Sequence, residues 1–312
     1  MSFRRFVYLV TDDFKRCNFL LRRVDMSRFF FPKREREGLL ADPPPLEEGR
    51  LPPVTMKFDP PICNVGNGYM DFMLFVGGDR GMNQNHRVLV TELTGRALLY
   101  DPESPSIRSL PSLTSPKCSP ISLIVGNKFY ILDTASRLSH TNNCFHSYMM
   151  YDGDWHCYSL APPPYIHANR SIICEGEAEH VDSYTVVGGS SIWISKSTLG
   201  THSFDTENHR WTKVGDWALP FFGHVQYVPE HKLWFGLSSG ESEIDCSVCF
   251  SNLTEMPPRS VNIWRDCTPP QWINMSSYLV HLGHSRFCHA TCWPTLALQA
   301  SPKHCMQSEA SP

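Results

Sequence analysis

The sequence lacks long hydrophobic runs and carries little charge. No stretch approaches the roughly 20 apolar residues that span a bilayer, and the longest candidate, Phe72–Val76, has only the length of a strand. The apolar residues after Arg5 end at Thr11, which is short for a signal-peptide core, so we expect no secretory signal. Charged residues make up 19% of the chain and the net charge is -3, which gives no electrostatic basis for binding nucleic acid or an anionic membrane.

Signatures of common catalytic sites are also missing. The chain contains no G-x-S-x-G elbow, no G-x-x-x-x-G-K-[ST] phosphate loop and no H-E-x-x-H zinc motif. Gly66-Asn67-Gly68 is too short for a dinucleotide fingerprint and is better interpreted as a turn. We therefore predict a non-enzyme without catalytic residues or a cofactor.

The twelve cysteines, from Cys17 to Cys305, show no paired spacing. In a chain without a secretory signal, such cysteines are typically unpaired buried thiols. The three N-x-[ST] sequons, at Asn169, Asn252 and Asn274, are then chance matches. We expect a cytoplasmic or nuclear protein.

One cysteine pair has the spacing of a zinc site. Cys246 and Cys249 form a C-x-x-C, and the other ligands could come from Cys288, His289 and Cys292. A strand with the alternation of Ile244, Cys246, Val248 and Phe250 would point Cys249 to its opposite face. No Gly or Pro lies between the two cysteines to form a chelating turn, so we predict no metal site.

Histidines lie near cysteines at two places. His281 and His284 precede Cys288, while His140 and His146 flank Cys144. A Cys–His nucleophile needs a lowered thiol pKa and a third residue that orients the base. The sequence shows neither feature, so we interpret these histidines as loop or interior side chains.

Composition and spacing favour a repetitive β structure. Aromatic residues at 12% and 25 prolines suit many short strands joined by turns. The phrases Tyr100-Asp101-Pro102, Tyr151-Asp152-Gly153 and Phe204-Asp205-Thr206 recur about fifty residues apart, which is typical of stacked units such as kelch-type blades. We expect each aspartate to form an Asx-type turn, and Trp155 and Trp211 to pack between blades.

Four successive units follow the same order of strand, tight turn, strand, loop, strand, turn and strand. Such meanders need neighbours on both sides, which a propeller provides. A β-sandwich, the alternative, would explain the strands but not their repeat. The strands expected in these units cover 71–76, 87–92, 96–100, 120–125, 128–132, 147–151, 155–160, 183–187, 190–194, 201–205, 210–214, 223–228, 232–237, 247–252 and 261–265.

The ends of the chain differ from these units. Residues 1–31 hold three apolar runs, Phe6–Val10, Phe19–Val24 and Met26–Phe31, which we interpret as strands that pack on the propeller. Residues 32–53 are charged and proline-rich, as in an exposed loop. Residues 54–288 would form about five or six four-stranded blades, and 289–312 a polar, disordered tail.

Three phrases resemble a family of uncharacterised, kelch-like proteins known chiefly from rice and related grasses and grouped under a domain of unknown function. They are Gly95–Asp101, Met26–Phe31 and Ser277–Gly283. The resemblance covers about residues 4–288 and implies a plant intracellular propeller of unassigned activity. The sequence departs from the family after Cys288, which is consistent with a truncated terminus and an incomplete last blade.

Three functional hypotheses follow. The leading one is a non-catalytic scaffold that binds an unidentified protein partner through its propeller loops, where binding residues concentrate. The second is a propeller-hosted enzyme, which would require titratable groups with shifted pKa values converging at the channel. The third is a truncated copy without activity.

Overall fold

The computed structural model is all-β, as the composition predicts. The strands, numbered β1 to β22, are accompanied in the described residues by one short 3-10 helix, η1 (Met26–Phe29). No helix in this part of the chain is long and apolar enough to cross a membrane. The structure describes residues 3–13, 15–30, 50–61, 70–77, 85–115, 117, 120–134, 143–164, 181–239, 247–264, 276–292 and 309–310.

The strands form antiparallel meanders in chain order. A parallel pairing of β12 with β16 joins two meanders into one eight-stranded sheet, while β20 and β21 form a separate hairpin. The first sheet holds β1 (Phe6–Asp13), β2 (Asn18–Asp25), β3 (Val54–Phe58) and β22 (Glu309–Ala310). The second sheet holds β4 (Met70–Gly77), β5 (Asn85–Glu92), β6 (Ala97–Asp101) and β7 (Ser106–Leu110), and the third holds β8 (Pro120–Val125), β9 (Lys128–Asp133), β10 (Phe145–Tyr151) and β11 (Asp154–Leu160). The eight-stranded sheet joins the meander of β12 (Ser183–Val187), β13 (Ser191–Lys196), β14 (Gly200–Asp205) and β15 (Arg210–Gly215) to that of β16 (Phe221–Val228), β17 (Leu233–Ser238), β18 (Val248–Ser251) and β19 (Ser260–Trp264), and the last hairpin is β20 (Ser276–Gly283) with β21 (Arg286–Cys292).

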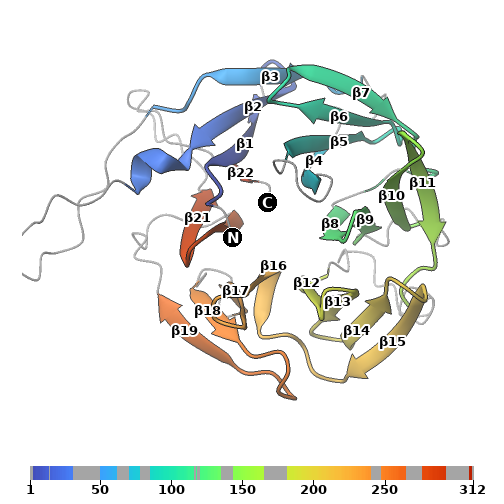
Figure 1. Cartoon of the computed structure of the whole chain (residues 1–312), viewed down its shortest axis with the longest axis vertical. Coiled ribbons are helices and arrows are strands. Elements are labelled where there is room, and N and C mark those ends of the chain that lie inside the picture. Colours follow the sequence, from blue (N-terminus) through green and yellow to red (C-terminus); the bar gives the residue numbers. More distant parts are fainter. Residues whose placement is uncertain are drawn as a thin grey trace, which may run out of the picture.

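The sheets follow one another around a ring (Figure 1). The first strand of each meander, such as β4, β8, β12 or β16, lies on the inner side, and the last, such as β7, β11, β15 or β19, lies on the rim. The inner strands of different sheets therefore border a shared central region.

Hydrophobic clusters fill the spaces between successive sheets. Between the second and third sheets, for example, Phe75 of β4 meets Phe129 of β9 and Trp155 of β11. The last cluster joins Val7 of β1 to Val280 and Leu282 of β20, so the two ends of the chain contact one another. Because each sheet buries side chains on both faces, the ring behaves as one packed body.

Two of the three recurrent aspartates form the expected Asx-type turns. The Asp101 carboxylate accepts hydrogen bonds from the backbone N–H groups of Glu103 and Ser104, at 3.0 and 3.2 Å. Asp205 accepts in the same way from Glu207 and Asn208, at 2.9 and 3.1 Å. Asp152 instead shares a two-residue hairpin turn with Gly153, and both have positive φ, which glycine and aspartate tolerate best.

Two sequence-based expectations differ from the structure at the chain ends. The run Met26–Phe31 was expected as a strand, but its first four residues form η1 because the Asp25 carboxylate caps the turn, accepting from the Ser27 N–H at 3.0 Å and its hydroxyl at 2.6 Å. At the other end, β21 continues to Cys292 because His289 and Cys292 pair with Leu279 and Ser276 of β20. Most of the expected loop at 32–53 lies outside the described residues.

Candidate functional site

The N-terminal segment places one arginine in the inner part of the ring. The backbone N–H of Arg4 donates to the Leu282 carbonyl of β20 at 2.6 Å, which fixes this segment against the last hairpin. The Arg4 side chain is half-buried, and its guanidinium has no hydrogen-bonding or ionic partner among the described residues. Burial lowers its pKa, and the described group that offsets this shift is the Tyr8 phenol.

Three histidines lie around Arg4. They are His86 at the start of β5, His224 of β16 and His281 of β20. Burial is the main cause that lowers their pKa values, to about 4 for His86 and His224, and the Arg4 charge lowers each further. At neutral pH these imidazoles are therefore neutral, and the charge of the group is the single positive charge of Arg4.

Gln226 links two of these histidines. The backbone N–H of His281 donates to Gln226 Oε1 at 2.7 Å. The side-chain amide nitrogen of Gln226 is therefore the end that faces His224 Nδ1, at 3.3 Å. An amide nitrogen can only donate, so His224 Nδ1 accepts and its proton resides on Nε2. Tyr184 of β12 stacks on the His224 ring with centroids 5.2 Å apart and holds its orientation. We call Arg4, His86, His224, Gln226 and His281 the axial cluster.

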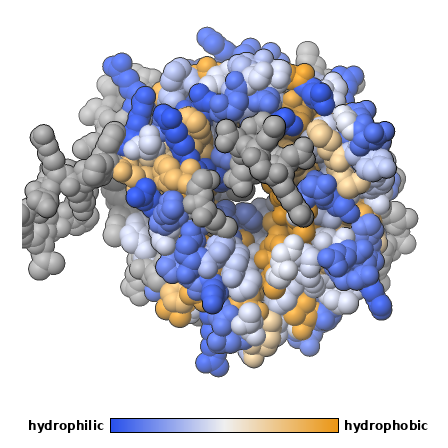
Figure 2. Space-filling view, viewed as in Figure 1, coloured by the Kyte–Doolittle hydropathy of each residue, from blue (hydrophilic) through white to orange (hydrophobic). Residues whose placement is uncertain are grey.

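The surface of the ring is hollowed near its centre, with polar residues over much of the face around the hollow (Figure 2). The axial cluster comes from the N-terminal segment and from three different sheets. A rigid scaffold thus holds donors of different chemistry in one region, although nothing local in the sequence marks them. Sequence reasoning singled out His281 only for its proximity to Cys288, and it missed Arg4, His86, His224 and Gln226.

A second polar group lies in the connection from β7 to β8. The buried Lys117 ammonium donates to the Asn143 carbonyl at 2.7 Å and to the Ser115 hydroxyl and carbonyl at 2.8 and 3.2 Å. His146 Nε2 lies 2.7 Å from the Thr114 hydroxyl. These contacts, with the Tyr148 hydroxyl donating to the Pro111 carbonyl at 2.6 Å, tie the connection to β10.

The Cys–His pairs of the sequence analysis do not form reactive thiols. Burial raises the pKa of Cys144 to about 11 and lowers that of the neighbouring His146 to about 4, so both are neutral at physiological pH. Cys288 pairs with Val280 in the last hairpin, and burial raises its pKa as well. His284 lies in the exposed turn of that hairpin, and His140 lies outside the described residues.

The structure describes Cys249 of the C-x-x-C pair but not Cys246. Cys249 is fully buried in β18, burial raises its pKa to about 12, and its thiol lies 3.9 Å from the Pro220 carbonyl. In the part of the chain that the structure describes, no three His, Cys, Asp or Glu side chains form a group that could hold a metal ion.

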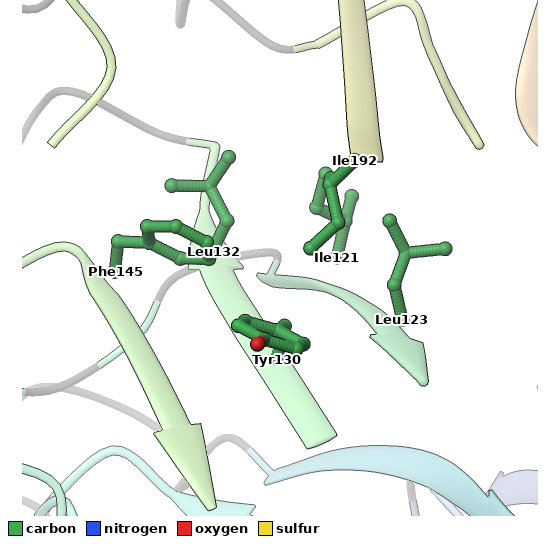
Figure 3. A pocket seen from close by; sticks show the side chains of 6 residues that line it. All are labelled: Ile121, Leu123, Tyr130, Leu132, Phe145 and Ile192. Atoms are coloured by element: carbon green, nitrogen blue, oxygen red, sulfur yellow. The ribbon is translucent and has the colours of Figure 1, made fainter. Parts of the chain in front are cut away.

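A small gap between the third sheet and the neighbouring β13 is apolar. Figure 3 shows its lining, which consists of Ile121, Leu123, Tyr130, Leu132, Phe145 and Ile192. Apart from the Tyr130 hydroxyl these side chains present carbon, whereas ligand sites combine apolar walls with several polar groups. We interpret the gap as imperfect packing between sheets.

The sequence comparisons show the family. The model of a protein family described as "Protein of unknown function (DUF1668)" matches residues 4–311, so the chain belongs to this family. No curated protein matches the chain. Among solved structures, a S. cerevisiae assembly described as Dbp5 L327V bound to Nup159, Gle1 H337R, IP6 and ADP contains a similar chain, with 14% identity, a TM-score of 0.37, and coverage of 90% of this chain and 67% of that one.

Proposed function

We propose that the ring is a kelch-like β-propeller of six blades with an incomplete last blade, and that it is a non-catalytic protein-interaction scaffold. The blade count rests on the hydrophobic clusters between successive sheets, the last of which joins β20 to β1. A plant protein of the cytoplasm or nucleus fits the resemblance to grass proteins. It also fits the reduced thiols of Cys144, Cys157, Cys249 and Cys288.

The observation that carries the interaction proposal is an aromatic surface at the rim. Tyr151 and Tyr158 are 65% and 46% exposed, and the His156 ring between them lies 6.2 and 6.3 Å from theirs. Aromatic side chains are enriched in protein interfaces because they bury a large area at a small entropic cost. We call these three residues the β11 surface.

Among the described residues, no strand pairs with the outer edge of β11. β11 is the edge strand of its sheet and holds no Lys, Arg or Pro, as is also true of β19. Such residues protect three other edges from pairing, namely Lys57 in β3, Arg108 in β7 and Lys213 in β15. We propose that an extended segment of a partner protein pairs with β11 and covers its aromatic side chains.

A matched pair of variants tests this proposal. Tyr158→Lys places a charge on the β11 surface, while Thr212→Lys places the same charge on the exposed edge strand β15. Proteins cross-linked to the wild-type chain in a plant-cell extract should be lost with Tyr158→Lys and kept with Thr212→Lys. Equal capture by both variants, with unchanged thermal melts, would contradict a role for β11.

A propeller-hosted enzyme is the alternative, and it is supported by the convergence of His86, His224 and His281 near Arg4. Neutral imidazoles with lowered pKa values are compatible with proton transfer, although weak bases transfer protons less effectively. The test is hydrolysis of a panel of phosphate and carboxylate esters. An activity that is lost in His224→Gln and kept in Tyr158→Lys would favour the enzyme over the scaffold.

A further inference from the structure

Arg4 differs from Arg5 and Arg23 by having no hydrogen-bonding or ionic partner among the described residues. Arg5 is exposed and forms an ion pair with Asp25 at 2.7 Å, and Arg23 pairs with Glu103 at 3.0 Å. The Arg4 backbone is hydrogen-bonded to Leu282 and burial lowers the pKa of its guanidinium, yet no described carboxylate forms an ion pair with it. A partly dehydrated cation without a counter-charge is costly, so its retention in the ring calls for an explanation.

The groups around Arg4 supply hydrogen-bond donors, and the described carboxylate that acts on the cluster, the exposed Glu230, acts on His281 and not on Arg4. Because Gln226 donates to His224 Nδ1, the Nε2–H of His224 remains a donor without a described partner. His281 Nε2 is a buried atom with no hydrogen-bond partner in the described residues. An arginine fork beside imidazoles that can donate or accept a proton matches the oxygen atoms of a phosphate or carboxylate group.

We propose that the axial cluster binds an oxyanion group of a small molecule, with the Arg4 guanidinium as its charged anchor and His224 Nε2–H as a second donor. The ligand would supply a negative charge to Arg4, which forms no ion pair among the described residues. The Arg4 backbone is held by its hydrogen bond to Leu282, and the His224 ring is held by Gln226 and Tyr184. This site is separate from the β11 surface and does not depend on the interaction proposal.

The test is a titration of the full chain, at constant ionic strength, with inorganic phosphate and in parallel with succinate, followed by the NMR signals of the histidine rings. We expect saturable binding of at least one probe, with shifts confined to a few histidine signals. The probe whose binding saturates shows whether the site prefers a phosphate or a carboxylate group. If neither probe saturates below about 10 mM, a concentration typical of weak specific sites, the proposal is overturned.

Three variants assign the binding to Arg4. Arg4→Gln should lower the affinity for the probe at least tenfold. Arg4→Lys keeps the charge but loses the two-pronged guanidinium, so it should lower the affinity less. Arg210→Gln removes the same charge from the exposed rim and should leave the affinity unchanged. Equal affinity in wild type and Arg4→Gln would overturn the proposal. Arg4→Gln should also keep any partner that is lost with Tyr158→Lys, so the two proposals can fail separately.

Discussion

Lys117 and Arg4 are both cations that burial affects, and the comparison between them separates structure from function. Lys117, in the β7–β8 connection, is 2% exposed and has three oxygen acceptors within 3.2 Å. Arg4, on the inner side of the ring, has no partner among the described residues. A buried polar group with its hydrogen bonds made stabilises the fold, whereas one without them is costly and calls for an explanation, for which we propose a ligand at Arg4.

The histidines beside each cation differ in their neighbours. His146 is fully buried and its Nε2 lies 2.7 Å from the Thr114 hydroxyl, which anchors a connection between two sheets, while its Nδ1 has no hydrogen-bond partner among the described residues. His224 is hydrogen-bonded through Nδ1 to Gln226, and its Nε2–H has no hydrogen-bond acceptor among the described residues. We therefore expect substitutions near Lys117 to change stability, and substitutions near Arg4 to change ligand binding.

The largest loss of stability should come from Trp155, which packs in the same region as Lys117. Trp155 is 4% exposed and lies 5.2 Å from the Phe75 ring across the space between two sheets. Trp155→Ala should lower the free energy of unfolding by about 4 kcal/mol, because it removes a large buried side chain and leaves a cavity. Urea denaturation measures this loss.

Trp264→Ala is the control for Trp155. Trp264 is 46% exposed on the rim strand β19, so its replacement should cost clearly less. Similar losses for both tryptophans would mean that the packing between the second and third sheets contributes little to stability.

The next largest effect should come from Lys117→Met. Methionine is similar in length but leaves the Asn143 and Ser115 carbonyls without their ammonium donor, which should cost about 3 kcal/mol. Lys15→Met, at an exposed turn, should leave the denaturation midpoint unchanged. A Lys117→Met variant as stable as wild type would show that the connection is held by Tyr148 and Thr114 without the lysine.

Local patterns predicted the strands and turns well, since alternation and Asx chemistry are encoded by adjacent residues. Asp101 and Asp205 form the expected turns, and Trp155 and Trp211 lie between sheets, the latter donating to the Ala161 carbonyl at 2.8 Å. The axial cluster could not be predicted in this way, because Arg4 and His281 meet only when the ring brings the two ends of the chain together. The helix η1 was missed because a capping aspartate outweighed an apolar run.

A smaller effect is expected on acidification from His146, to which His86 and His224 should add, because burial also lowers their pKa values to about 4. Burial lowers the pKa of His146 to about 4, below its ordinary value of 6.5, so between these values the unfolded chain binds more protons than the folded one. The stability that His146 contributes is full above pH 6.5 and is lost as the pH falls toward 4. Between pH 7 and pH 5 the loss should be about 2 kcal/mol.

The measurement is the unfolding free energy at pH 7 and pH 5 for wild type and His146→Gln. The glutamine variant should be less stable at pH 7 but should lose less on acidification. Phosphate at pH 5 should stabilise the wild type and His146→Gln alike, because an anion would bind at Arg4 and not at His146. An unchanged pH dependence in His146→Gln would place the acid-sensitive groups elsewhere in the ring.

The smallest effect should come from the direct counterpart of Lys117→Met. Arg4→Met removes a cation that has no described partner, so the change in stability should stay within about 1 kcal/mol and could be favourable. Added phosphate should raise the thermal midpoint of the wild type but not of Arg4→Met, because a ligand that binds only the folded state stabilises it by mass action. If Arg4→Met instead loses as much stability as Lys117→Met, Arg4 has a structural partner, and the reason to place an anion beside it disappears.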